Sequence, residues 1–213
     1  MQTFIDHARA FPETVKRQPH RFARLAGEQR PQAMFISCSD SRVVPALFTG
    51  AGPGDIFELR AVGNIVPRYR PQAACAAASA IEFAVTGLGV ADIVVCGHTY
   101  CGAVRALADA ARTATMPMVR RWLGHTADLA TAAEDLAADL AADLAADPAA
   151  DLAADLAGAA QRHVLTQLDH LQSHPCVARR LATGRLRLHA WVYAVDTGQV
   201  HAARPGSDAF RPL

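Results

Sequence analysis

Apolar and polar positions along this chain follow two alternating patterns. Three short runs are rich in β-branched and other apolar residues, and each predicts a buried strand: 33–37, 55–62 and 92–95. Stretches with apolar residues at helical spacing separate or follow these runs and predict helices: 71–88, 102–111 and 161–183. Strands that alternate with helices are typical of a parallel sheet with crossover helices.

The predicted helix over 71–88 is rich in alanine. We expect it to carry its larger apolar residues on one side: Ile81, Phe83, Ala84 and Leu88. Gly87 and Gly89 are expected to end it.

The two ends of the chain extend the predicted core. Apolar residues at helical spacing over 1–27 predict an N-terminal helical arm. The strict alternation over 186–195, followed by the turn residues 196–198, predicts another strand and a hairpin, and the tail 204–213 is expected to be irregular. We therefore expect one α/β domain over 1–213, with a central, mostly parallel β-sheet flanked by helices.

Residues 135–157 form a low-complexity insertion built on Asp-Leu-Ala-Ala repeats and interrupted by Pro148. A four-residue repeat drifts by about 40° per unit on an α-helix, so its leucines wind around the helix instead of forming one apolar face. Alanine still favours helix. The segment therefore predicts a solvent-exposed helical insertion, and a dedicated partner-binding helix is the alternative.

Composition narrows the possible functions. The net charge is +1, from 21 basic and 20 acidic residues, so no charged surface for nucleic acid or an anionic membrane is indicated. No apolar run approaches the roughly 20 residues that span a bilayer, and residues 1–7 do not resemble a signal peptide. The five cysteines are unevenly spaced and predict free thiols, so a reducing, cytoplasmic location is expected.

Two motifs concentrate reactive side chains at predicted strand ends. Cys38 begins a C-x-D-x-R motif after the first strand, and His98 and Cys101 form an H-x-x-C motif after the third. Ligands of open parallel sheets bind beyond the carboxyl ends of strands. Either cysteine alone would be read as an ordinary core residue, but together the three side chains predict a Cys₂His zinc site. Three protein ligands leave a fourth coordination position open, as in catalytic zinc sites.

Asp40 and Arg42 stand two residues apart, so their side chains can face the same way on an extended segment. Beside a zinc ion, the carboxylate would orient the zinc-bound hydroxide, and the guanidinium would hold that carboxylate ionised. Two alternatives stay open: a surface ion pair of little consequence, or an Asp40 that turns onto the zinc and fills the open position.

With these motifs, the chain resembles the β-class carbonic anhydrases of the plant-like and bacterial branch. Three further stretches support the resemblance: 60–67, 80–85 and 97–104. The similarity runs from about 29 to 112 and from about 164 to 200, so the repeat lies outside it. The resemblance implies one Zn²⁺ per chain, the reversible hydration of CO₂ to bicarbonate and a proton, and a homodimer or tetramer with sites at the dimer interface.

The resemblance also implies a substrate pocket, with residues drawn from both chains of the dimer. Phe83 replaces a tyrosine that is common in the family, and Phe35 replaces the tryptophan of the branch with an inhibitory bicarbonate site. The implied substrate-binding residues are Gln29, Phe57, Val62, Phe83 and Gly102.

Two other functions are compatible with these motifs. The same site could hydrolyse a related small substrate, such as carbonyl sulfide or carbon disulfide. The chain could also be a non-catalytic zinc or redox-sensing interaction protein, but metal binding alone would not need the Asp40–Arg42 pair. We therefore expect a zinc lyase, a carbonate dehydratase.

Overall fold

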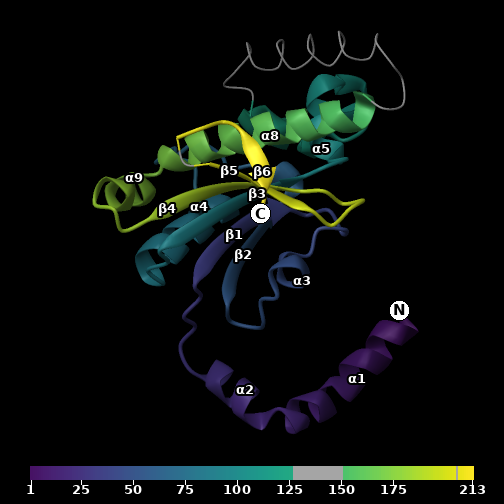
Figure 1. Cartoon of the computed structure of the whole chain (residues 1–213), viewed down its shortest axis with the longest axis vertical. Coiled ribbons are helices and arrows are strands. Elements are labelled where there is room, and N and C mark those ends of the chain that lie inside the picture. The colour runs from purple at the N-terminus through teal and green to yellow at the C-terminus, as the bar shows by residue number, and fades with distance from the viewer. Residues whose placement is uncertain (127–150, 205) are drawn as a thin grey trace.

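The computed structural model describes residues 1–126, 151–204 and 206–213. Within these residues, one sheet has the strand order β2-β1-β3-β4-β5-β6 (Figure 1). Strands β2, β1, β3 and β4 are parallel, and β5 and β6 continue the sheet antiparallel. The expected mostly parallel α/β sheet is confirmed. The strands are β1 (Ala33–Cys38), β2 (Ile56–Ala61), β3 (Asp92–His98), β4 (Arg187–Tyr193), β5 (Val200–Ala203) and β6 (Phe210–Pro212).

Helices connect and flank the strands. The described α-helices are α1 (Gln2–Arg17), α2 (Pro19–Ala23), α3 (Pro45–Thr49), α4 (Ala76–Glu82), α5 (Gly102–Ala108), α6 (Pro117–Leu123), α8 (Asp151–Gln172) and α9 (Pro175–Ala182). Shorter helical segments are η1 (Arg24–Ala26), η2 (Val62–Asn64), the π-helix η3 (Phe83–Gly87), η4 (Ala110–Thr113) and η5 (Gly124–Thr126).

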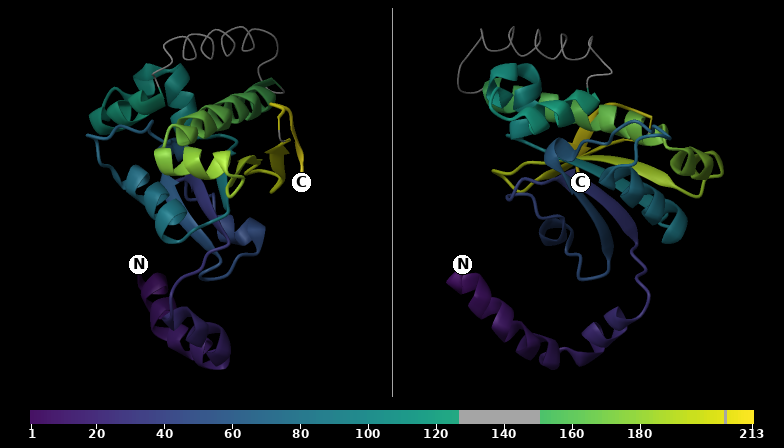
Figure 2. Two further views of the ribbon diagram at one scale, coloured as in Figure 1. Left: turned by 90° about the vertical axis from the view of Figure 1, so that its left-hand side faces the viewer. Right: turned by 180° about the vertical axis from the view of Figure 1, so that it is seen from behind.

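The two faces of the sheet are covered differently (Figures 1 and 2). On one face, apolar side chains of β1, β3 and β4 pack against α4, α8 and α9, where Ile36, Val95 and Val164 are fully buried. On the other face, β1, β3 and β4 carry an aromatic cluster that contacts α3 through Phe48. Both faces of the central parallel strands β1 and β3 are therefore buried, which explains their nearly continuous apolar sequences.

The sequence placed the helix over 71–88 too early and assigned one side chain to the wrong face. The helix begins at Ala76, because Cys75 is extended and its sulfur accepts the N–H of Ala78 as a cap. Ile81 and Ala84 are buried, but Phe83 is 49% exposed. Two residues correspond to about 200° of helical rotation, so Phe83 lies on the side opposite Ile81.

The tail is not wholly irregular, because β6 pairs with β5 through Ala203 and Phe210. Residues 135–150 of the repeat lie outside the described residues, and the backbone of 151–157 belongs to α8. The division of the chain into one domain with an N-terminal arm over 1–27 and an insertion over 135–157 therefore stays a prediction.

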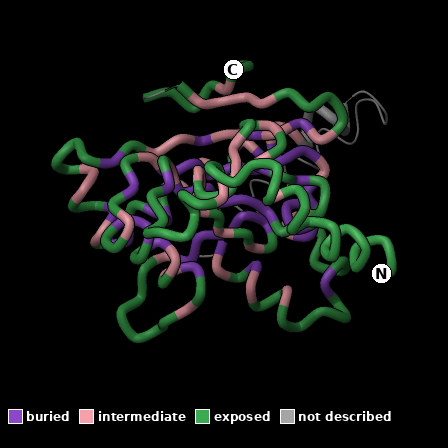
Figure 3. Tube along the Cα trace, turned by 90° about the horizontal axis from the view of Figure 1, so that it is seen from below, coloured by how far each residue is buried: buried purple, intermediate pink, exposed green. Residues whose placement is uncertain are grey.

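Helices α1 and α2 form the expected N-terminal arm, which extends away from the sheet (Figures 1 and 2). Most of its residues are exposed (Figure 3). Neither helix has a buried residue, and an edge-to-face contact between Phe11 and Phe22, with ring centroids 5.8 Å apart, joins them. Phe4 is 73% exposed. The apolar side of the arm is thus left without a covering surface in a single chain. No helix among the described residues is long and apolar enough to cross a bilayer.

Gly97 allows α8 to approach the end of β3. A Cβ at this position would lie 2.6 Å from Cγ2 of Val164 and 3.5 Å from the carbonyl oxygen of Ala160. Real Cβ atoms do not come that close to other atoms, so only glycine lets the helix rest on this part of the strand. The next residue is His98, and its position therefore depends on this close contact.

We expect Gly97→Ala to lower the free energy of unfolding by about 1–3 kcal/mol, because the added methyl group overpacks the contact with Val164. Gly124→Ala is the matched control. Gly124 has helical backbone angles (φ −59°, ψ −16°) and open space around its Cα. Urea denaturation of both variants and the wild type measures the difference, and equal stabilities of the two variants would contradict the packing argument.

Candidate metal centre

The three predicted ligand residues converge at the carboxyl edge of the parallel sheet. Cys38 ends β1, His98 ends β3, and Cys101 directly precedes α5. All three are buried, and their ligand atoms lie within 4.8 Å of one another. The two Sγ atoms are 4.0 Å apart.

A tight turn between His98 and Cys101 brings both side chains to the same point. Tyr100 has a φ of +58°, in the left-handed region that non-glycine residues rarely adopt. This conformation reverses the chain within two residues, and Nη2 of Arg42 donates a hydrogen bond to the Tyr100 carbonyl at 3.2 Å. Arg42 of the C-x-D-x-R motif therefore stabilises the conformation of this turn.

The hydrogen bonds of His98 determine which of its ring nitrogens is free. Nδ1 lies 2.8 Å from the carbonyl oxygen of Thr99, so Nδ1 carries the proton. In the neutral ring, Nε2 then offers a lone pair, and it is buried without a hydrogen-bond partner. A buried ring nitrogen without a hydrogen-bond partner, close to two sulfurs, can serve as a metal ligand. The hydrogen bond to the backbone carbonyl fixes the tautomer of the imidazole ring.

The two thiols cannot both ionise easily in this environment. The hydrogen bond from Cys101, followed by contacts with His98 and with backbone N–H groups, lowers the pKa of Cys38. The same interaction and burial raise the pKa of Cys101, because a second thiolate would stand beside the first. A divalent cation would remove this conflict, and tetrahedral zinc needs sulfurs about 3.8 Å apart. The residues therefore fit a zinc ion.

Asp40 and Arg42 form the expected pair next to these ligands. Nε and Nη2 of Arg42 donate to the two carboxylate oxygens of Asp40 at 2.9 and 2.7 Å, and the Arg42 backbone N–H adds a bond of 3.0 Å. These bonds from Arg42 hold the pKa of Asp40 well below its usual range. Oδ2 of Asp40 lies 3.8 Å from Nε2 of His98. An ionised carboxylate is thus held at the edge of the metal site.

Arg60 shapes the loop that carries this pair, and the sequence did not single it out. Its guanidinium donates to the carbonyl oxygens of Cys38 at 3.1 Å, of Asp40 at 2.7 Å and of Val43 at 2.7 Å. One side chain therefore satisfies three backbone acceptors of the tight loop. Its signal was a second charged residue, after Glu58, near the end of β2.

Polar side chains on α8 hold the segment that follows β2, and these were also missed. Nε2 of His163 lies 2.7 Å from the Gly63 carbonyl, and Oε1 of Gln167 accepts the N–H of Val66 at 2.9 Å. His170 and His174 bind the carbonyls of Val66 and Pro67. Their signal was a row of polar residues at helical spacing: His163, Gln167 and His170 within α8, and His174 just before α9.

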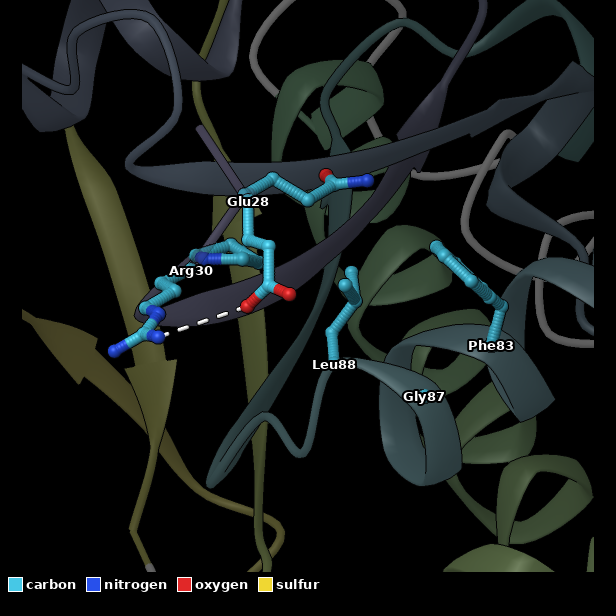
Figure 4. Close-up of a pocket in the computed structure, with 7 residues that line it drawn as sticks. Glu28, Arg30, Phe83, Gly87 and Leu88 are labelled. Carbon is cyan, nitrogen blue, oxygen red and sulfur yellow. Dashed lines mark ion pairs between the residues drawn. The ribbon is translucent and has the colours of Figure 1, made fainter. Parts of the chain in front are cut away.

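The predicted substrate residues fall into two groups. Val62 and Gly102 lie beside the ligand residues, since the former directly follows β2 and the latter directly follows Cys101. Gln29 and Phe83 instead line an open groove of about 580 Å³ together with Glu28, Arg30, Pro31, Gly87 and Leu88 (Figure 4).

This groove lies near the amino ends of the parallel strands, whereas the ligand residues lie at their carboxyl ends. Phe57 contacts Phe83, with ring centroids 5.9 Å apart, and pairs with Met34 at the start of β1. Cys38 stands four residues further along the same strand, roughly 13 Å away at about 3.3 Å per residue. A single chain therefore does not bring its two groups of predicted site residues together.

Comparison with known proteins identifies similar sequences over most of the chain. The family model for carbonic anhydrase matches residues 33–200. A carbonic anhydrase of Pseudomonas aeruginosa is 46% identical over 193 residues, which cover 90% of this chain and 82% of that protein. Carbonic anhydrase 1 of Escherichia coli O157:H7 is 40% identical and covers 100% of this chain and 92% of its own length.

Solved structures agree with the sequence comparison. The β-carbonic anhydrase CcaA superimposes with a TM-score of 0.85 at 33% identity, over 100% of this chain and 92% of that one. A tetrameric β-carbonic anhydrase of Sordaria macrospora gives a TM-score of 0.77 at 26% identity, over 95% of this chain and 97% of that one.

The ligand geometry leads to a test of metal content. We expect the purified protein to hold about one zinc ion per chain and Cys101→Ser to lose most of it, because a serine hydroxyl does not replace a thiolate ligand. Cys176→Ser is the matched control, since Cys176 lies in α9, away from the ligand residues. Elemental analysis after dialysis gives the stoichiometry, and equal zinc in both variants would show that Cys101 is not a ligand.

Proposed function

Because the chain belongs to the β-carbonic anhydrase family and is a carbonate dehydratase, we propose that it hydrates CO₂ at a zinc ion held by Cys38, His98 and Cys101. The observation that carries this proposal is the partnerless Nε2 of His98, buried between two thiols and next to the Asp40 carboxylate. A structural Cys₂His group would not need a carboxylate fixed at its edge.

Bound zinc supplies Lewis acidity that makes a hydroxide nucleophile available near neutral pH. Asp40 would accept the hydrogen bond of that nucleophile, because its carboxylate is ionised and has no proton to donate. This bond would turn a lone pair of the nucleophile toward the carbon of CO₂. The products are bicarbonate, which leaves the site, and a proton, which passes to solvent.

Arg42 fixes the carboxylate of Asp40 as a hydrogen-bond acceptor. Its two bonds to the carboxylate fix the orientation, and its bond to the Tyr100 carbonyl anchors the guanidinium to the turn between His98 and Cys101. A carboxylate held in this way is hindered from turning onto the metal. A zinc ion held by Cys38, His98 and Cys101 would then keep a position for the reactants.

The two groups of substrate residues support a site shared by two chains. CO₂ has three atoms and needs far less space than the 580 Å³ groove around Gln29 and Phe83, which is in the range of pockets for drug-sized molecules. We infer that a second copy places its Gln29, Phe57 and Phe83 opposite Val62 and Gly102. The amide N–H of that Gln29 would donate to a substrate oxygen.

Exposed apolar side chains near both groups support the same homodimer. Leu47 on α3 is 78% exposed, Val62 is 41% exposed and Phe83 is 49% exposed. The apolar side of the N-terminal arm, including Phe4 and Phe11, is equally uncovered. Burying these side chains against a second copy would join the two halves of the site and give the arm a surface to cover.

A cytoplasmic location is part of the proposal. All five cysteines are free, and the two ligand thiols need reducing surroundings to stay available for a metal.

We expect Asp40→Asn to lower kcat/KM for CO₂ hydration by about 10²–10⁴-fold, because an amide cannot replace the ionised acceptor. Stopped-flow measurement of CO₂ hydration with a pH indicator tests the proposed activity in the wild type and the role of Asp40 in the variant. Zinc content is determined on the same samples. Asp208→Asn, an exposed aspartate, is the matched control. Full zinc and near wild-type activity in Asp40→Asn would contradict the role of Asp40.

A mixture of two inactive variants tests the shared site. Asp40→Asn and Gln29→Ala are mixed, dissociated and reassociated. In a hybrid dimer, one site would combine an intact Asp40 from one chain with an intact Gln29 from the other. Random pairing makes half of the dimers hybrids with one intact site each, so about a quarter of the wild-type activity should return.

Each variant taken alone through the same procedure is the control and should recover nothing. If both residues served a site within one chain, every hybrid site would carry one substitution. The mixture would then show only the average of the two variants.

A further inference from the structure

The turn η2 connects the metal centre to a tryptophan on a distant helix. In the peptide group between Val62 and Gly63, the carbonyl oxygen of Val62 accepts a hydrogen bond from Nε1 of Trp122 at 2.8 Å. The N–H of Gly63 in the same peptide group donates to Sγ of Cys38 at 3.3 Å. One peptide group therefore lies between an indole on α6 and a metal-ligand sulfur.

The geometry of a trans peptide makes these two hydrogen bonds cooperate. Its C=O and N–H bonds point in opposite directions within one plane, so a donor on the oxygen side fixes the direction of the N–H. A hydrogen bond to the oxygen also polarises the group and strengthens the bond that its N–H donates. The indole thus acts on the sulfur through the peptide, without touching the sulfur.

The surrounding residues keep this peptide group from rotating. Gly63 has a φ of +70°, and a Cβ there would lie 2.8 Å from Cβ of Ala103 on α5, so only glycine suits the position. The next carbonyl, that of Gly63, is bound by Nε2 of His163 at 2.7 Å. Helices α5, α6 and α8 therefore all hold one turn beside Cys38.

We propose that Trp122 is a positioning residue of the metal centre, which acts through the Val62–Gly63 peptide on the sulfur of Cys38. The inference rests on the proposed zinc site. A hydrogen bond to a thiolate withdraws electron density from the sulfur, so the ligand gives less charge to the metal. Groups of this kind outside the ligand set adjust the affinity and reactivity of metal sites.

We call the two hydrogen bonds that connect Trp122 to Cys38 through the Val62–Gly63 peptide the relay. Trp122→Phe tests it, because phenylalanine keeps an aromatic ring on α6 but has no N–H. In the cobalt-loaded protein, the sulfur-to-metal charge-transfer band should shift to lower energy, because the sulfur becomes a stronger electron donor. In the zinc protein, kcat/KM for CO₂ hydration should fall by roughly tenfold. An unchanged absorption spectrum in Trp122→Phe would overturn the relay.

Trp191→Phe is the matched control. Trp191 packs edge-to-face on Phe35 in the aromatic cluster on the other face of the sheet, with ring centroids 5.6 Å apart. This variant makes the same chemical change and should keep the wild-type absorption band. An equal band shift in both variants would mean that loss of tryptophan packing, and not the indole N–H, changes the metal site, and this too would overturn the relay.

A measurement on the wild type keeps the proposal testable if Trp122→Phe does not fold. In the cadmium-loaded protein with labelled glycine, the amide proton of Gly63 should show scalar coupling to the metal through the sulfur, and absence of coupling would refute the relay. Failure of the zinc site itself is a different result, because the wild type would then bind neither cobalt nor cadmium.

Discussion

Two thiols 4.0 Å apart in a buried position are the constraint on which the rest of the structure depends. Without a cation, only one of them can ionise readily, as the opposite directions of their pKa shifts show. The parallel sheet brings them together by ending β1 at Cys38 and β3 at His98. The left-handed turn at Tyr100 then returns the chain so that Cys101 completes the group.

The backbone around this group is held mainly by side chains from outside it. Arg60 binds three carbonyls of the loop over 38–43, Trp122 and His163 bind the turn η2, and Gln167 continues the same row of contacts along the segment after β2. In the turn η2, Gly63 and Asn64 are buried. Backbone polar groups in such a turn lose their hydrogen bonds to water, so each needs such a partner. The precision of the metal centre therefore comes from α6 and α8 as much as from the strands.

The site as we propose it draws on two chains. The ligand residues occupy the carboxyl edge of the sheet, and the groove of Gln29 and Phe83 lies at the amino edge. A two-fold pairing that places one edge against the other would explain why apolar side chains stay exposed near both. The same pairing would explain the N-terminal arm, which extends away from its own sheet (Figure 1).

The sequence by itself determined the alternation of strands and helices, the candidate ligand residues Cys38, His98 and Cys101, and the Asp40–Arg42 pair. These features are local, because periodicity and motif spacing act over a few residues. The sequence missed the start of α4 at Ala76 and the strand β6, since a sulfur cap and an edge pairing depend on neighbours in space.

Only the tertiary structure decided that Gln29 and Phe83 lie far from Cys38 in the same chain. Only it decided, too, that Trp122 donates a hydrogen bond to the carbonyl of Val62, which lies 60 residues away in the sequence. Contacts between distant segments depend on how the elements pack, and no local pattern in the chain encodes them.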